Sequence, residues 1–302
     1  MKGNEAVAEA AIRAGCDGYF GYPITPQSEV MEYLMVEKPH ERTGMVVLQA
    51  ESETASINML YGGAGTGKMV MTSSSSPGIS LMQEGISYMA GAELPALIVN
   101  VVRGGPGLGT IQPSQADYFQ AVKGGGHGDY NMIVLAPASV QEMCDFAKLG
   151  FELAFKYRGP VMILSDGAIG QMMEKVVLFD QVPRRTEEEI IQQCPWAATG
   201  KPKNREHIII TSLDLDPAGQ ERVNLKLQAK YRTMEEHEVR YEEISCDDAE
   251  YLFIAFGLSA RICQKAIDIA RSEGIRGGFW RRLPFSPSPR NPLLVNARKG
   301  KG

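Results

Sequence analysis

The stretch Leu94-Pro95-Ala96-Leu97-Ile98-Val99-Asn100-Val101-Val102-Arg103-Gly104-Gly105 decides the fold class. Residues 96–102 are rich in apolar and β-branched side chains, and Arg103 and two glycines follow them. A short apolar run of this kind, next to turn residues, is typical of a strand buried on both faces. Such strands belong to parallel sheets that helices cover on two sides. We therefore expect a parallel sheet at the centre of the fold.

Similar runs recur through the first part of the chain, with segments of helical spacing between them. The predicted strands are residues 18–22, 45–49, 69–73, 96–102, 132–135 and 161–164. Three helix boundaries follow from local signals: Asn4 as a first cap, Thr25-Pro26 as a second start, and Ser139 as the cap of a helix over 140–157. The alternation predicts a doubly wound α/β domain over residues 1–178.

The composition changes after this domain. Residues 179–245 are dense in charge and are expected to form a structured connector, and residues 246–302 are expected to start a second, truncated α/β domain that resembles the carboxyl-terminal domain of transketolases. The expected elements are a strand at 207–211 and a helix at 222–241 in the connector, then a strand at 251–256 and a helix at 259–271.

Composition and charge exclude several classes of protein. The chain has 302 residues, of which 44% are hydrophobic and 22% charged, as in ordinary globular proteins. Its net charge of −5 argues against nucleic-acid binding. The apolar runs fall short of the roughly 20 residues that span a membrane, so we expect a cytoplasmic protein. The 5 cysteines form no close pairs, so we expect no iron–sulfur cluster or other metal on this chain.

The segment Gly62-Gly63-Ala64-Gly65-Thr66-Gly67-Lys68-Met69 approaches the pattern of a phosphate-binding P-loop. Met69 stands where a P-loop needs Ser or Thr for magnesium. The segment also leads from a predicted helix at 52–61 into a predicted strand, which is the reverse of the order that a P-loop requires. It is therefore interpreted as a glycine-rich helix stop.

Four loops that follow predicted strands carry the residues most suited to chemistry. They cover residues 22–28, 50–53, 74–78 and 103–114. Ligands of open parallel sheets bind beside the carboxyl ends of strands, so these loops should form one crevice. Two other combinations are weaker: His127 with Asp129 as an acid–base pair, and Glu51 with Glu53 as paired carboxylates, because side chains two residues apart on a helix diverge.

Five motifs in the chain strongly resemble those of one family. They are Gly21-Tyr22-Pro23-Ile24-Thr25-Pro26, Gln49-Ala50-Glu51-Ser52-Glu53, Thr72-Ser73-Ser74, Arg103-Gly104-Gly105-Pro106-Gly107 and Gly124-Gly125-Gly126-His127-Gly128-Asp129-Tyr130. The family is that of the α subunits of 2-oxoacid:ferredoxin oxidoreductases, and the likeness is greatest to the branched-chain type, which acts on 3-methyl-2-oxobutanoate. The resemblance covers about residues 3 to 275.

The resemblance implies that this chain grips the aminopyrimidine end of thiamin diphosphate, whereas a separate β subunit binds the diphosphate and magnesium. By motif position Glu51 is the buried acid–base group beside the pyrimidine, Arg103 holds the substrate carboxylate, and Thr25 places a hydroxyl over the reacting centre. The other cofactor-binding residues implied in this way are Pro23, Ile24, Ser74 and Ser75.

The implied reaction decarboxylates the 2-oxoacid, transfers the acyl group to coenzyme A and passes electrons to ferredoxin. The implied partners are the β subunit, ferredoxin-like γ and δ subunits, and ferredoxin itself. Two alternatives remain: 2-oxoglutarate or another 2-oxoacid as substrate, and a non-catalytic scaffold subunit. Gln27 and Ser76 depart from many relatives and leave the substrate open.

The carboxyl-terminal sequence departs from the family pattern from about residue 277. The apolar strand expected there is missing, and a shifted reading frame would restore a family-like string, which leads to the hypothesis of a frameshift near this codon. The second domain would then consist of one strand and one helix. Such a fragment cannot cover its own sheet, so residues 279–302 are predicted to be poorly ordered.

Overall fold

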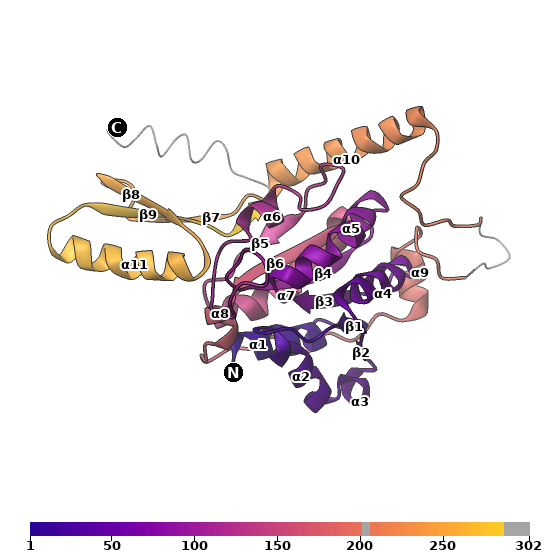
Figure 1. Ribbon diagram of the computed structural model, residues 1–302, viewed down its shortest axis with the longest axis horizontal. Helices are drawn as coiled ribbons and strands as arrows, with labels where there is room; N and C mark the ends of the chain where they lie inside the picture. The colour runs from indigo at the N-terminus through magenta and orange to yellow at the C-terminus, as the bar shows by residue number, and fades with distance from the viewer. Residues whose placement is uncertain (201–205, 287–302) are drawn as a thin grey trace.

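The computed structural model describes residues 1–200 and 206–286, with one large sheet at its centre (Figure 1). The strand order is β10-β5-β6-β4-β3-β1-β2. The strands are β1 (Gly18–Gly21), β2 (Val46–Gln49), β3 (Val70–Ser74), β4 (Ala96–Val102), β5 (Ile133–Leu135), β6 (Pro160–Asp166) and β10 (Pro284–Ser286). Strands β1 to β6 run parallel, and β10 pairs antiparallel with β5. The predicted α/β class with a parallel sheet is confirmed.

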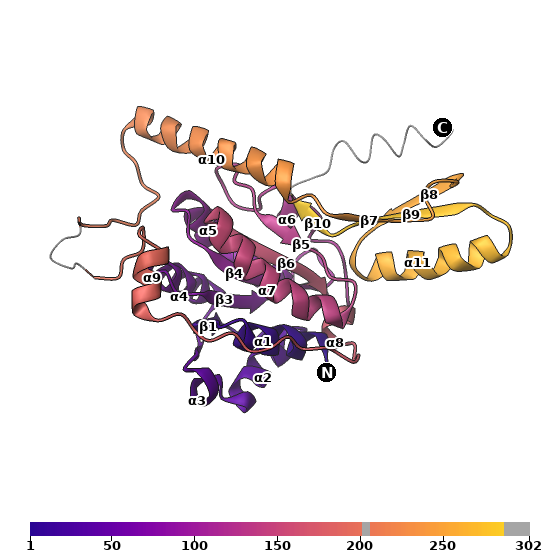
Figure 2. The same ribbon diagram turned by 180° about the vertical axis from the view of Figure 1, so that it is seen from behind.

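Helices cover both faces of this sheet (Figures 1 and 2). On one face α1 (Gly3–Arg13) packs against α7 (Val140–Tyr157), and on the other α4 (Glu53–Gly65) packs against α5 (Ser76–Gly91). All residues of β3, β4 and β6 are buried, because both faces of these strands meet helices. Four shorter helices complete this part: α2 (Ser28–Glu37), α3 (Pro39–Thr43), α6 (Tyr118–Val122) and α8 (Gly167–Gln171).

One of the three predicted helix boundaries is confirmed and two are wrong. The Ser139 hydroxyl caps α7 and accepts a hydrogen bond from the backbone N–H of Glu142 at 3.1 Å. Helix α1 begins before Asn4, whose side-chain amide donates instead to the carbonyl of Pro26 at 2.7 Å. Helix α2 begins only at Ser28, after the loop that contains Thr25. A tertiary contact between α1 and this loop therefore replaces both local caps.

The glycine-rich segment forms the last turns of α4 and the turn into β3. The helix ends at Gly65, and β3 begins at Val70. Gly67 has a φ of 75°, a left-handed conformation that favours glycine. The segment runs from helix to strand, as predicted, and so it lacks the geometry of a P-loop.

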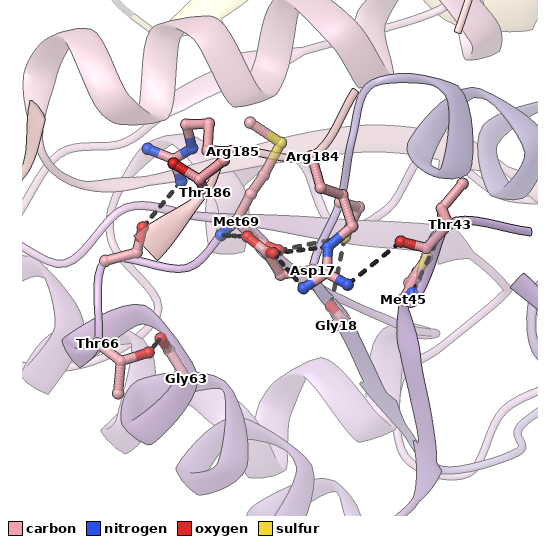
Figure 3. Close-up of polar contacts among 12 residues, drawn as sticks. Asp17, Gly18, Thr43, Met45, Gly63, Thr66, Met69, Arg184, Arg185 and Thr186 are labelled. Carbon is pink, nitrogen blue, oxygen red and sulfur yellow. Dashed lines mark hydrogen bonds and ion pairs between the residues drawn. The ribbon is translucent and has the colours of Figure 1, made fainter. Parts of the chain in front are cut away.

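The charged connector lies against the amino edge of the main sheet. Arg184 donates to the Asp17 carboxylate at 2.6 and 2.8 Å and to the Thr43 carbonyl at 3.3 Å (Figure 3). Asp17 also accepts the backbone N–H of Met69 at 2.8 Å, so one buried carboxylate joins the connector to the starts of β1 and β3. The connector helices are α9 (Glu187–Gln193) and α10 (Pro217–His237).

The strand predicted at 207–211 is wrong, because these residues form neither helix nor strand. Ile210 packs on the main core, whereas Ile209 is 72% exposed. The β-branched run at 207–211 is therefore a loop, and the Ile210 side chain anchors it to the core. Helix α10 follows, a few residues earlier than predicted, and Lys230 on it contacts Glu93 at 3.2 Å.

A second, three-stranded sheet lies beside the main one (Figure 1). Its strands are β7 (Tyr241–Ile244), β9 (Gly277–Arg282) and β8 (Tyr251–Ala255), in that order, and α11 (Gly257–Ser272) packs against them. Strand β7 comes from the end of the range expected to be connector. The strand and helix predicted after residue 250 are both present as β8 and α11.

The prediction that residues 279–302 are poorly ordered is wrong as far as residue 286. Strand β9 is the central strand of the second sheet, and Phe279 on it is buried against α11. Trp280 is also fully buried, and β10 then adds an antiparallel strand to the main sheet. Strand β9 is hydrogen-bonded to a strand on each side, and this pairing orders residues whose sequence alone did not indicate a strand. Residues 287–302 lie outside the described residues.

Glu9 is a buried carboxylate that joins three helices, and its replacement tests this packing. It accepts hydrogen bonds from Arg13 at 2.7 Å, from Arg42 at 2.9 Å and from Tyr33 at 3.1 Å. Burial raises the pKa of Glu9, but the hydrogen bonds from Arg42 and Arg13 together hold that pKa below its ordinary value. Glu9→Gln should lower the free energy of unfolding by about 2 kcal/mol at pH 7.

The pH dependence of this difference has a definite sign. A lowered pKa contributes stability that is present above the unfolded-state value of about 4.3 and is lost as the pH falls through the folded-state value. Urea unfolding of the two proteins should therefore converge below pH 4, whereas Glu32→Gln, an exposed control on α2, should match the unmodified chain throughout. A constant gap at every pH would contradict this role of Glu9.

Candidate active site

The carboxyl ends of β1 and β3 form the topological switch point of the main sheet. From β1 the chain moves outward to β2, returns across β1 to β3, and then continues in the opposite direction to β4. The loops after β1 and β3 therefore turn to opposite sides of the sheet, and the region beside these two strand ends, called the crevice below, is where ligands of such sheets bind. The loops after β2 and β4 lie on its two flanks. The four loops selected from the sequence thus meet at one edge.

Arg103 joins two of these loops. Its guanidinium donates to the carbonyl of Thr25 at 3.0 Å and to that of Leu108 at 3.0 Å, and its side chain is largely buried. Its backbone N–H and carbonyl both bond to the hydroxyl of Ser76, at 3.1 and 3.2 Å. The structure therefore brings Arg103 and Thr25 together, with the arginine bound to backbone carbonyls of the protein itself.

The end of β3 carries buried serine hydroxyls, one of which has hydrogen-bond partners and two of which have none within the described residues. Ser73 bonds to Gln27 at 2.6 Å and to the Tyr19 hydroxyl at 2.8 Å, and burial raises the pKa of Tyr19 to about 12. The hydroxyls of Ser74 and Ser75 are fully buried and have no hydrogen-bond partner within the described residues. Unpaired buried polar atoms cost free energy, so they mark a place where another group is expected to bind.

Two acidic residues after β2 differ sharply in burial. Glu51 is exposed, which contradicts the expectation of a buried carboxylate at that position. Glu53 is only 6% exposed and lies in the first turn of α4. A Cβ added to Gly78 would lie 2.7 Å from Glu53 Oε1 and 2.1 Å from Ser74 Oγ, so the three residues are neighbours. The buried carboxylate of this crevice is therefore Glu53.

A local signal could have identified Glu53 from the sequence. Ser52 caps α4, and its hydroxyl accepts the backbone N–H of Ala55 at 3.1 Å. Glu51 precedes this cap, whereas Glu53 follows it as the first helical residue, where the helix dipole favours a negative charge. In the structure Glu53 is buried next to Gly78 of α5, whereas Glu51 is exposed.

The other residues predicted for the site lie in the loop after β1 or in the loop before β5. Pro23 and Thr25 are exposed and Ile24 is half-buried, so this loop forms an open rim. His127 lies in the loop before β5 and packs against the later part of α5, with its carbonyl bonded to the Ser87 hydroxyl at 2.7 Å. That loop leads into the amino end of a strand, so His127 and Asp129 are separated from the crevice.

Comparison with known families identifies the family to which the chain belongs. Residues 9–243 match the family described as pyruvate flavodoxin/ferredoxin oxidoreductase, thiamine diphosphate-binding. The chain belongs to this family. The resemblance found in the five motifs is thereby confirmed, and so is the prediction of a 2-oxoacid:ferredoxin oxidoreductase subunit. The family's description also makes the site a part of a thiamin-diphosphate-binding domain.

Several named proteins are similar to this chain. The ketoisovalerate oxidoreductase subunit VorB of Methanothermobacter thermautotrophicus is 51% identical over 99% of this chain and 83% of its own length. The 2-oxoglutarate synthase subunit KorA of Methanocaldococcus jannaschii is 35% identical over 96% of this chain and 83% of its own length. The VorB likeness agrees with the branched-chain type.

Solved structures share the fold. The chain superposes with a TM-score of 0.86, at 28% identity, on 2-oxoglutarate:ferredoxin oxidoreductase from Magnetococcus marinus, solved with 2-oxoglutarate, coenzyme A and succinyl-CoA bound. All of this chain is covered, but it spans only 56% of that chain. A split-gene transketolase, an inactive tetramer, gives a TM-score of 0.58 at 14% identity over 99% of this chain and 77% of its own, which shows a common fold alone. In the two described ranges no helix is long and apolar enough to cross a membrane.

The residues of the crevice fit the aminopyrimidine end of thiamin diphosphate. That ring presents both hydrogen-bond donors and acceptors along one edge. The site offers a buried carboxylate at Glu53 and unpaired hydroxyls at Ser74 and Ser75, and Gly78, which has no Cβ, lets the Ser74 and Glu53 side chains approach each other closely. These four residues are the ones on this chain that would hold the ring.

Gly78→Ala tests the close packing at this site. The new methyl group would collide with Ser74 and Glu53, so both side chains would have to move. We expect a loss of about 1–3 kcal/mol in the free energy of unfolding and weaker thiamin diphosphate binding in the assembled enzyme. Gly62→Ala is the matched control, because nothing lies within 4 Å of its added Cβ in α4, and it should stabilise the chain by about 0.5–1 kcal/mol. Equal effects of the two substitutions on cofactor binding would contradict the assignment.

Proposed function

We propose that this chain is the subunit of a 3-methyl-2-oxobutanoate (ketoisovalerate) oxidoreductase that binds the aminopyrimidine end of thiamin diphosphate. The observation that carries the proposal is the buried Glu53 beside unpaired hydroxyls at the switch point of the sheet. The 51% identity to a ketoisovalerate oxidoreductase subunit over nearly the whole chain supports the substrate.

Glu53 is the acid–base group of this proposal, in place of Glu51. Bound thiamin diphosphate supplies a nucleophilic carbon for attack on a 2-oxo group. A carboxylate held against the pyrimidine edge exchanges a proton with the ring and so favours the form of the cofactor that reacts. Glu53 is buried and can do this without competition from water, whereas Glu51 lies exposed on the rim, where a partner subunit would reach it.

Arg103 and Thr25 act together in this proposal. The guanidinium fixes the loop after β1 through the Thr25 carbonyl, so Arg103 is a positioning residue for that loop and not a free receptor for the substrate carboxylate. Thr25 keeps its place on the exposed rim, with Pro23 and Ile24 beside it. Each of the three can face the reacting centre when the second chain closes the crevice.

The rest of the reaction belongs to other chains. We propose a β subunit that binds the diphosphate and magnesium, ferredoxin-like γ and δ subunits that carry the electrons to ferredoxin, and coenzyme A as the acyl acceptor. The solved relative with coenzyme A and succinyl-CoA bound supports the role of coenzyme A. A second candidate substrate is 2-oxoglutarate, which the names of relatives at 34–36% identity favour.

Glu53→Gln and Glu51→Gln separate the two acidic residues by function. In complex with the partner subunits, Glu53→Gln should lower kcat for viologen dye reduction by about 10²–10⁴, because the amide cannot exchange the proton. Glu51→Gln should leave the rate close to that of the unmodified complex. A large loss at Glu51 together with full activity at Glu53 would return the catalytic role to Glu51.

The substrate is tested by comparing 2-oxoacids in the same complex. We expect kcat/KM for 3-methyl-2-oxobutanoate to exceed that for 2-oxoglutarate by about 100-fold or more, because an apolar acyl pocket cannot pair a second carboxylate. The release of carbon dioxide and the formation of the acyl-CoA measure the reaction. A preference for 2-oxoglutarate would reject the branched-chain substrate and leave the cofactor assignment intact.

A further inference from the structure

A second pocket lies at the amino edge of the main sheet, on the side opposite to the crevice. Its volume is about 600 Å³. It is lined by residues from the end of α1, the start of β3, the carboxyl-terminal half of α7 and the connector. Small-molecule sites have volumes of roughly 300–1,000 Å³, so the pocket is large enough for a ligand of its own.

Two consecutive arginines hold the connector wall of this pocket in place. Arg184 is bound to Asp17 and to the Thr43 carbonyl, and Arg185 donates to the Gly67 carbonyl at 2.8 Å (Figure 3). The guanidinium carbon of Arg185 also lies 4.4 Å from the ring centre of Phe155 on α7. The wall is therefore fixed to the sheet edge and to α7, and the pocket is formed before any ligand arrives.

The floor of the pocket is apolar, and Phe151, Phe155 and Trp196 contribute aromatic rings to it. Four cations and one carboxylate, Glu152, also line the pocket, and three of the cations are Lys148, Arg158 and Arg185. Within the two described ranges none of the three has a carboxylate within 4.0 Å, in contrast to Lys156 of the same lining, which pairs with Glu238 at 2.5 Å. Unneutralised cations over aromatic rings are arranged to receive an anion.

Arg158 is the cation that points most clearly to a ligand. Its guanidinium carbon lies 4.6 Å from the ring centre of Trp196, and its Nε is buried without a hydrogen-bond partner in the described parts of the chain. Removal from water without a counter-charge in contact lowers the pKa of Arg158. An acidic group bound here would satisfy both the charge and the unpaired N–H.

We infer that this pocket binds an organic anion with an aromatic or apolar body, of the class of aryl-alkyl carboxylates. The body would lie against Phe151, Phe155 and Trp196, and the carboxylate would bind Arg158 with support from Lys148. A nucleotide fits less well, because the polar edges of a base need hydrogen-bond partners that a mainly aromatic floor does not offer. The inference is independent of the proposed catalytic role, since the pocket and the crevice lie at opposite edges of the sheet.

The test uses the full chain with 3-phenylpropionate as the probe. Titration calorimetry should show saturable binding at millimolar concentrations or below, with quenching of the fluorescence of Trp196, since the other tryptophan, Trp280, is fully buried away from the pocket lining. The neutral 3-phenylpropionamide should bind at least about tenfold more weakly, which corresponds to the loss of one charge-assisted contact of about 1.4 kcal/mol. Equal binding of the acid and the amide, or no binding of the acid, would overturn the inference without any mutation.

Variants then locate the site. Arg158→Gln and Lys148→Gln should each weaken 3-phenylpropionate binding by about fivefold or more, whereas Lys265→Gln, an exposed cation on α11, should leave it unchanged. Thermal unfolding of each variant checks that it is folded. Unchanged affinity in both pocket variants, or an equal loss in the control, would place the probe elsewhere and reject the site. Thiamin-diphosphate-dependent activity of the assembled complex should be the same with and without the probe.

Discussion

The reversal of chain direction between β1 and β3 is the constraint on which the site depends. Because the chain winds outward on both sides of this point, ligands of such sheets bind beside the strand ends here, and the hydroxyls of Ser74 and Ser75 at the end of β3 have no hydrogen-bond partner within the described residues. A buried carboxylate is costly unless something compensates it. Glu53 lies in the first turn of α4, where the helix dipole favours a negative charge and so provides part of that compensation. A bound heterocycle with donors and acceptors would provide the rest.

The two edges of the same sheet carry different kinds of site. At the carboxyl edge the contacts of Arg103 and Ser76 hold neighbouring loops together, and Pro23 and Thr25 on the rim are exposed. At the amino edge the connector itself closes a pocket, because Arg184 and Arg185 bind groups at the ends of strands and helices. One architecture thus supports a shared site and a self-contained one without contact between them.

Much of the fold was accessible from the sequence because the strands are buried on both faces. The run at 96–102 and its five counterparts could be read from local composition, and Ser139 marked a helix start. The role of Asn4 could not be predicted in this way, since its side-chain amide donates a hydrogen bond to the carbonyl of Pro26, which lies in a loop distant along the chain. Strand β9 was missed because Arg281 and Arg282 interrupt its apolar pattern, although the buried guanidinium of Arg281 pairs with Glu142 and Glu242.

The sequence by itself determined the fold class, the family and the four loops that build the site, since these follow from short-range patterns along the chain. Only the tertiary structure shows that Glu53 is buried and Glu51 exposed, because burial depends on which side of the Ser52 cap meets the sheet edge and α5. It also decided that Arg103 binds backbone carbonyls and that arginines of the connector enclose a pocket at the far edge. Contacts between residues distant in the chain set these features, and no local pattern encodes them.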